Sequence, residues 1–182
     1  MTGASTGIGR EIVLQLAAAG VKVAASARSA EKLAGLGNGV LVVPLDVTDA
    51  AACAEAVNSI ESTLGPIDLA VLGAGTYEPV SIDAIEPPAF AAMMNTNYMG
   101  VVNCLAPLAP RMIARNAGHL AWIASVAGYM GLPKAAAYGP TKAALINLGE
   151  SLYPEMRLKG VQVSVINPGF VATPLTAQND FE

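Results

Sequence analysis

The chain opens with the stretch Thr2-Gly3-Ala4-Ser5-Thr6-Gly7-Ile8-Gly9, in which glycine recurs at positions 3, 7 and 9. Apolar residues then recur at helical spacing until Gly20 ends the pattern. This pattern predicts a glycine-rich loop that runs into a helix. A helix N-terminus offers free backbone N–H groups and a partial positive charge, so the loop is a candidate site for a pyrophosphate. Glycines also form ordinary tight turns, and that alternative stays open on this pattern alone.

Short apolar runs alternate with stretches of helical periodicity along the rest of the chain. We expect strands at residues 21–27, 40–45, 67–72, 119–124 and 161–166, and helices at residues 30–36, 50–64, 88–116 and 136–159. The connections are too long for hairpins, and right-handed crossovers therefore give parallel strands. The sequence predicts a single α/β domain over residues 1–182, with a doubly wound parallel sheet of the Rossmann type.

A phosphate-binding loop of this kind normally follows a strand, yet only Met1 precedes Thr2. We therefore expect the domain to lack its first strand. That strand is central in a doubly wound sheet, so its loss is expected to expose two strand edges and to remove a layer of the core.

Composition excludes several classes of protein. Hydrophobic residues make up 53% of the chain and its formal charge is −4. No apolar run reaches the roughly 18 residues that span a bilayer, and no signal peptide is recognisable, so we expect a cytoplasmic protein with no membrane partner. The lack of Lys and Arg clusters argues against nucleic acid. Cys53, Cys104 and the single His119 form no ligand grouping, so no metal site is expected, and both cysteines are interpreted as buried small hydrophobic residues.

Dinucleotide preference is usually set at the end of the second strand of such a fold, where an acidic residue binds the ribose 2′-hydroxyl. Here the segment contains Ser26, Arg28 and Ser29 and no acid. Arg28 can pair with a 2′-phosphate, which favours NADP(H) over NAD(H). A solvated arginine after a strand is the alternative. Asp46, after the next strand, is expected either to accept a hydrogen bond from the adenine or to cap the following helix.

Tyr138 and Lys142 are spaced by one helical turn at the start of an expected helix, so the phenol and the ammonium share one face. A nearby cation favours the phenolate and would lower the pKa of the tyrosine toward working pH. Tyr138 would then be a usable acid or base. Taken alone, the pair is also what a helix surface shows by chance.

The wider set of motifs resembles the classical short-chain dehydrogenase/reductase family. It consists of Thr2-Gly-x-x-x-Gly-Ile-Gly9, Asn97, Ser125, Tyr138 with Lys142, Asn167-Pro168-Gly169 and Thr173. The resemblance covers essentially the whole chain. It implies that Tyr138 exchanges a proton with the carbonyl or alcohol oxygen, and that Ser125 hydrogen-bonds that oxygen. It also implies that Lys142 holds the nicotinamide ribose and that Asn97 anchors a water in a proton relay.

The resemblance further implies which residues contact the cofactor. Beside Tyr138 and Lys142, these are Gly3, Ser5, Thr6, Gly7, Ile8, Gly9, Arg28, Asp46, Val47, Ala74, Gly75, Pro168, Gly169, Val171 and Thr173. The cofactor would carry the hydride, while the protein supplies position and proton.

Two departures from the family pattern stand out. The family usually has Asn-Asn-Ala-Gly where this chain reads Leu72-Gly73-Ala74-Gly75, so we expect some loss of rigidity there with binding retained. Members also continue past Thr173 through a substrate lid and a final strand. We therefore expect the domain to be incomplete at both ends.

The sequence thus predicts an NADP(H)-dependent reductase or dehydrogenase that acts on a small ketone, aldehyde or secondary alcohol. A catalytically silent nucleotide-binding module, or an inert fragment, is the alternative. The helices expected at residues 88–116 and 136–159 resemble those through which the family forms dimers and tetramers, so a homodimer or homotetramer is expected.

Overall fold

A computed structural model describes residues 1–178 of the chain. Its strands are all parallel and fall into two groups. One group pairs β1 (Val23–Ala27) with β2 (Val40–Pro44), and the other has the order β3 (Leu69–Leu72), β4 (Gly118–Ile123), β5 (Val161–Ile166). The parallel α/β architecture expected from the sequence is confirmed.

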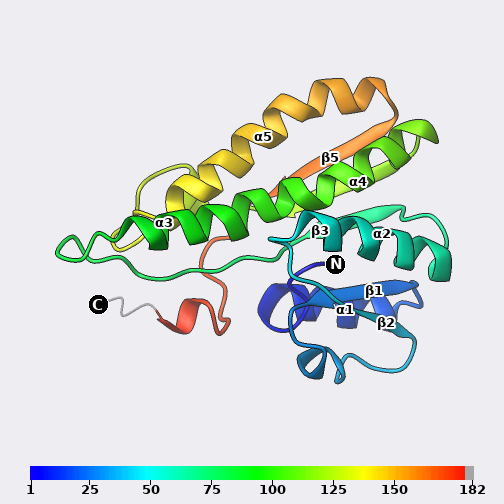
Figure 1. Cartoon of the computed structure of the whole chain (residues 1–182), viewed down its shortest axis with the longest axis horizontal. Helices are drawn as coiled ribbons and strands as arrows, with labels where there is room; N and C mark the ends of the chain where they lie inside the picture. The colour runs from blue at the N-terminus through cyan, green and yellow to red at the C-terminus, as the bar shows by residue number, and fades with distance from the viewer. Residues whose placement is uncertain (179–182) are drawn as a thin grey trace.

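The helices cover both sides of these strands. They are α1 (Gly7–Ala18), α2 (Ala50–Leu64), α3 (Pro87–Met94), α4 (Gly100–Ala114) and α5 (Tyr138–Leu158), with short turns η1 (Glu31–Leu33), η3 (Val126–Gly128) and η4 (Thr176–Gln178). In Figure 1, α2, α4 and α5 lie in front of the strands, whereas α1 lies behind β1 and β2. This is the doubly wound arrangement.

Two elements differ from the sequence-based expectation. The single helix expected at residues 88–116 is interrupted by a π-helical turn, η2 (Asn95–Met99), which separates α3 from α4. A π turn inserts an extra residue and redirects side chains, and here it contains the fully buried Asn97. The helix expected at residues 30–36 shrinks to η1 because Gly35 and Gly37 follow at once.

Met1 and Thr2 occupy the space between the two groups of strands. Thr2 forms parallel bridges to both Ser26 and Leu72. The Met1 amino group donates to the Ala24 carbonyl at 2.8 Å, and the Thr2 N–H donates to the Val71 carbonyl at 3.0 Å. Beyond them a cavity of about 250 Å³ lies between β1 and β3. The expected pair of strand edges is therefore present, and these two residues connect them.

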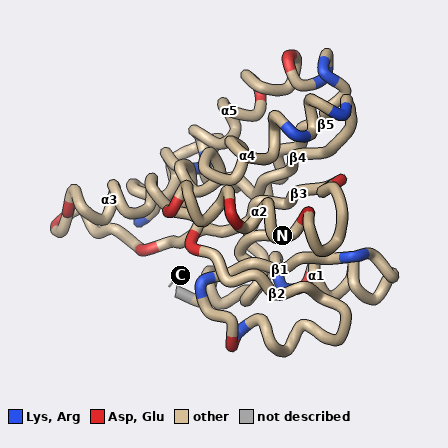
Figure 2. Tube along the Cα trace, turned by 45° about the vertical axis from the view of Figure 1, so that its right-hand side comes forward, with Lys and Arg blue, Asp and Glu red and all other residues tan. Residues whose placement is uncertain are grey.

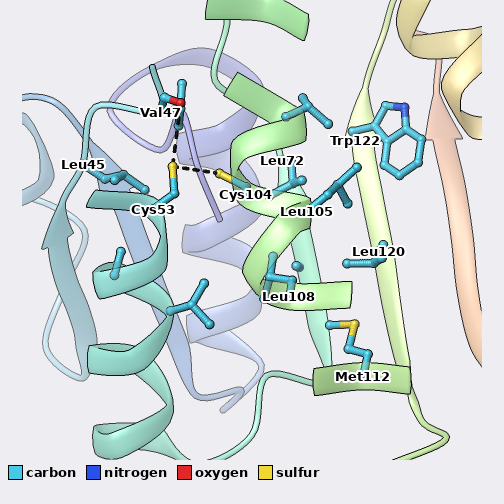
Figure 3. Packing of buried hydrophobic residues seen from close by; sticks show 14 of the residues in the cluster. Leu45, Val47, Cys53, Leu72, Cys104, Leu105, Leu108, Met112, Leu120 and Trp122 are labelled. Carbon is cyan, nitrogen blue, oxygen red and sulfur yellow. Dashed lines mark hydrogen bonds between the residues drawn. The ribbon is translucent and has the colours of Figure 1, made fainter. Parts of the chain in front are cut away.

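The same gap separates the two larger hydrophobic clusters of the interior. The larger lies between α2, α4, α5 and the strands β3 to β5, and the smaller lies between α1, β1 and β2. Figure 3 shows Cys53 of α2 beside Cys104 of α4 in the larger cluster, where Leu105 and Leu108 also pack. The two thiols are buried with their Sγ atoms 3.7 Å apart. Their interpretation as buried small residues is confirmed.

Lys and Arg occur at several separate places along the described trace, among them the neighbouring ends of α4 and α5 (Figure 2). Within residues 1–178, no helix combines the length and apolarity that a membrane crossing requires.

The gap between β1 and β3 generates a stability prediction. Fusing an apolar segment of about five residues to Met1 should add one strand that pairs with both edges.

We expect this extension to raise the melting temperature by at least about 5 °C. The measurement is thermal unfolding followed by circular dichroism. A glycine-serine extension of equal length is the control, and it should leave the melting temperature nearly unchanged. Equal effects of the two extensions would contradict the strand-accepting gap.

Candidate active site

The glycine loop lies where the two groups of strands meet. Gly3 has φ +71°, and a Cβ there would lie 2.5 Å from the Gly73 carbonyl oxygen. A Cβ on Gly9 would overlap the Gly3 carbonyl oxygen. Both positions therefore require glycine, which lets the backbone approach closely. The free N–H groups of the first turn of α1 follow directly after Thr6, the N-cap of this helix.

The segment at residues 72–75 is bound to the start of the chain through a hydroxyl group. Thr2 Oγ1 accepts hydrogen bonds from the N–H groups of Gly73 at 3.1 Å and Ala74 at 3.2 Å. These bonds connect the end of β3 to the start of the glycine loop. The loss of rigidity expected from the missing asparagines stays a prediction.

The catalytic residues predicted from the sequence come from three elements. Ser125 follows β4, and its Oγ accepts from the Ala127 N–H at 3.2 Å. Tyr138 begins α5, and Lys142 follows one turn later, with its side chain directed into the protein. Asn97 lies in the π turn between α3 and α4.

Burial dominates the electrostatics of Tyr138. Desolvation raises the pKa of its phenol above the ordinary value of 10.0, whereas the hydrogen bond with Ser125 acts to lower that pKa and Tyr77 acts to raise it. The net effect is a raised pKa rather than the lowered one expected from the sequence, because loss of solvent is the larger effect. The lowering of this pKa by Lys142 stays a prediction.

Lys142 is held by a backbone carbonyl. Its Nζ donates to the Ile123 carbonyl oxygen at 2.8 Å and lies 5.4 Å from the centroid of the Tyr138 ring. The residue is 5% exposed, and burial lowers the pKa of its ammonium group to about 8. The distance to the ring is compatible with a cation–π contact.

Asn97 uses its side-chain amide within the protein. Its Oδ1 accepts from the Thr76 N–H at 2.7 Å, and its Nδ2 donates to the Thr76 carbonyl at 2.9 Å and to Thr141 Oγ1 at 3.1 Å. Thr141 Oγ1 in turn donates to the Tyr138 carbonyl at 2.7 Å. Asn97 thus links the segment after β3 to the first turn of α5, and the water proposed for this residue stays a prediction.

A pocket of about 230 Å³ opens beside the carboxyl ends of β3, β4 and β5. It brings together most of the residues predicted from the sequence: Gly3, Ser5, Thr6, Gly7, Ile8, Gly9, Gly75, Ser125, Tyr138, Lys142, Pro168, Gly169, Val171 and Thr173. Thr173 lies over the glycine loop, since a Cβ on Gly7 would be 3.1 Å from Thr173 Cγ2.

Five predicted residues lie outside the lining of this pocket. They are Arg28, Asp46, Val47, Ala74 and Asn97. Arg28 is exposed just after β1, and Asp46 is exposed just after β2. The Asp46 carboxylate accepts from the Thr48 N–H at 3.0 Å and from Thr48 Oγ1 at 2.8 Å, which is the main reason that its pKa is lowered. It does not cap α2, because Asp49 does so through the Ala52 N–H.

Sequence reasoning missed two residues beside Tyr138. Tyr77 lines the pocket, and its ring lies edge-on to the Tyr138 ring. Thr141 is fully buried and connects Asn97 to Tyr138. The sequence did contain a signal for Thr141. It follows Tyr138 by three residues in an expected helix, so the two residues lie on the same face. Tyr77 lies in a loop without periodicity, so no pattern pointed to it.

Comparisons with known proteins agree with this geometry. The chain matches the short chain dehydrogenase family over residues 1–181. It is 38% identical to an uncharacterized oxidoreductase of Myxococcus xanthus, over 100% of this chain and 74% of that protein. It is 35% identical to an acetoacetyl-CoA reductase of Shinella zoogloeoides, over 96% of this chain and 74% of that protein.

Among solved structures, a short-chain dehydrogenase from Streptomyces avermitilis superposes with a TM-score of 0.90 at 30% identity. The match covers 96% of this chain and 66% of that structure. The chain thus spans about two thirds of the solved relative and about three quarters of the curated ones.

The burial of Lys142 generates a second stability prediction. The unfolded chain, with an ordinary lysine pKa of 10.5, binds more protons than the folded one above pH 8. Stability should therefore rise as pH increases from about 8 to 10.5. Lys142→Met removes the buried charge at the cost of one hydrogen bond, so we expect it to stabilise the protein at pH 7 by about 1–2 kcal/mol.

This gain should shrink as the pH approaches 10, where the parent lysine becomes neutral. Urea unfolding of both proteins between pH 7 and 10 measures the difference. The exposed Lys159 provides a matched control, because Lys159→Met should change stability little at any pH. A constant difference between the parent and Lys142→Met across this range would show that the ammonium is not desolvated.

Proposed function

Because the chain belongs to the short-chain dehydrogenase family, we propose that it interconverts a carbonyl and an alcohol with a nicotinamide dinucleotide, using Tyr138 as acid and base. One observation carries the proposal. Tyr138 and Ser125 open into the same glycine-lined pocket, with the ammonium of Lys142 beside the Tyr138 ring. The family and the names of its relatives support nicotinamide-dependent oxidoreduction.

The residues of this pocket fit a dinucleotide. Gly3 and Gly9 leave a cradle that a Cβ would fill, and the first turn of α1 offers N–H groups and its positive dipole end to a pyrophosphate. Gly75, Pro168, Gly169, Val171 and Thr173 line the pocket further along. When bound, the nicotinamide supplies or accepts the hydride.

Tyr138 moves the proton. Because burial raises its pKa, the phenol is protonated at neutral pH and can donate to a carbonyl oxygen during reduction. The Ser125 hydroxyl hydrogen-bonds the same oxygen and orients it. Lys142, held by the Ile123 carbonyl, places positive charge near the ring and stabilises the phenolate that remains. In the reverse reaction, the phenolate accepts the proton of the alcohol.

Arg28 supports NADP(H) as the preferred cofactor. It follows β1, its side chain is exposed, and its charge contributes to the low pKa of Asp46. A guanidinium there can pair with a 2′-phosphate. Ser26 is buried beneath the Met1–Thr2 segment, so Ser29 is the better placed of the two serines to add a hydrogen bond.

We further propose that the substrate is a small ketone, aldehyde or secondary alcohol, and that the protein acts in the cytoplasm as a homodimer or homotetramer. The long helices α4 and α5 are the proposed subunit contacts.

A catalytically silent nucleotide-binding module is the second candidate. One observation favours it: Met1 and Thr2 are the residues that join the two groups of strands across the gap that the glycine loop spans. If that junction is too weak to fix the loop, the protein binds a nucleotide without assembling a productive site.

Replacement of Tyr138 distinguishes these candidates. Tyr138→Phe removes the proton donor and keeps the ring, so we expect the turnover of NADPH with a panel of small ketones to fall at least about 100-fold. NADPH binding should change little. Tyr153→Phe is the control, because this exposed tyrosine lies on the same helix. Binding without turnover in the parent would favour the silent module, and unchanged turnover in Tyr138→Phe would remove Tyr138 from the mechanism.

The cofactor preference has its own test. Arg28→Asp should repel a 2′-phosphate and accept hydrogen bonds from a ribose 2′-hydroxyl. We expect the ratio of kcat/KM for NADPH to that for NADH to fall by at least about tenfold. Arg10→Asp, at an exposed arginine contact with Gly35, controls for loss of positive charge. An unchanged ratio in Arg28→Asp would argue for NAD(H) or for no preference.

A further inference from the structure

We propose that Tyr77 is a positioning residue whose ring holds the Tyr138 ring in its productive orientation and shields the phenol from water. The inference rests on the proposed function, in which Tyr138 transfers the proton. Tyr77 would act through Tyr138, without itself exchanging a proton with the substrate.

The contact between the rings is direct and specific. Their centroids are 5.2 Å apart and their planes meet at 77°, so one ring presents its edge to the face of the other. This is the favoured geometry of an aromatic pair, because the positive edge meets the negative face. Lys142 Nζ also lies 5.4 Å from the centroid of the Tyr138 ring. A neighbouring aromatic ring and a cation therefore both restrict the Tyr138 ring.

Tyr77 is itself fixed by the network around Asn97. The residue before it, Thr76, exchanges two hydrogen bonds with the Asn97 side chain, at 2.7 and 2.9 Å. The same amide reaches Thr141, whose hydroxyl donates to the Tyr138 carbonyl. Tyr77 is thus connected to Tyr138 in two ways. One is the direct contact of the rings, and the other runs through the hydrogen bonds of Asn97 and Thr141.

A second connection lies three residues further along. The Val80 N–H donates to the Lys134 carbonyl at 3.0 Å, which joins the segment after Tyr77 to the loop before α5. Val80 also packs in a small buried cluster with Met93 and Ala137, against which Tyr138 lies. Tyr77 is therefore held on both sides by elements that also determine where α5 begins.

The buried ring of Tyr77 also keeps water away from the Tyr138 phenol. The residue is 9% exposed and lines the pocket into which Tyr138 opens. Desolvation raises the pKa of Tyr77, so its hydroxyl is neutral at working pH. A neutral, bulky ring beside Tyr138 excludes water from the phenol, and loss of solvent is the largest cause of the raised pKa of Tyr138. Removing the Tyr77 ring should therefore lower the pKa of Tyr138.

The test compares Tyr77→Leu with Tyr77→Phe in the ketone reduction assay. We expect Tyr77→Leu to lower kcat about tenfold, because an aromatic contact is lost, while KM and the NADPH dissociation constant change less than about twofold. Tyr77→Phe keeps the ring and should keep kcat. Tyr129→Leu is the control, since this tyrosine is 66% exposed and lies outside the pocket lining.

The pH profile separates positioning and shielding from a merely structural role. With the ring removed, kcat for reduction should begin to decline at lower pH than in the parent, because the phenol titrates earlier. Absorbance titration of tyrosinate gives the same information without turnover. The difference between the parent and Tyr138→Phe isolates the Tyr138 phenol, and repeating that difference in the Tyr77→Leu background should show its pKa moved toward 10.

Each outcome decides the inference. Unchanged kcat and an unchanged Tyr138 titration in Tyr77→Leu would overturn it, and so would equal losses in the leucine and phenylalanine variants. If Tyr77→Leu melts more than about 5 °C below the parent, Tyr77→Met, whose flexible side chain adapts to an irregular space, takes its place in both measurements. Full activity of Tyr138→Phe would instead overturn the proposed function, so the two failures are distinguishable.

Discussion

Thr2 makes the contacts on which the arrangement of this molecule depends. Its backbone bridges to Ser26 of β1 and to Leu72 of β3, and its hydroxyl accepts from the N–H groups of Gly73 and Ala74. Thr2, together with Met1, therefore joins the two groups of strands, and it anchors the glycine loop that follows. Because α1 starts from that loop, the direction of its N-terminus also depends on Thr2.

On the other side of the pocket, desolvation controls the chemistry. Lys142 is held inside by one carbonyl and has no carboxylate partner among the residues described. The raised pKa of Tyr138 likewise comes mainly from burial. A buried, unpaired ammonium costs folding free energy, and its retention beside a phenol is what a site selected for proton transfer would show. Stability and function make opposite demands on this position.

Much of the fold and part of the site followed from local pattern. The strands, the glycine loop and the shared face of Tyr138 and Lys142 are set by residues close together in the chain, where periodicity is informative. The contacts of Asn97 were beyond such reasoning, because they join residues 21 and 44 positions away. The π turn that carries Asn97, the hydrogen bonds of Thr2 with Gly73 and Ala74, and the direction of the Lys142 side chain depend on tertiary packing for the same reason. Electrostatics was the least predictable, since burial raises the pKa of Tyr138 where the sequence had indicated a lowered one.

The division of the interior into two clusters has a consequence for cooperativity. The cluster around α1, β1 and β2 and the cluster around β3 to β5 bury separate sets of side chains, so each can lose its packing without first disrupting the other. Hydrogen exchange would then proceed through two partly independent opening reactions, with slower exchange in the larger cluster. A ligand that contacts both the glycine loop and the segment after β5 would couple the two opening reactions. With the ligand bound, the two clusters would then unfold together.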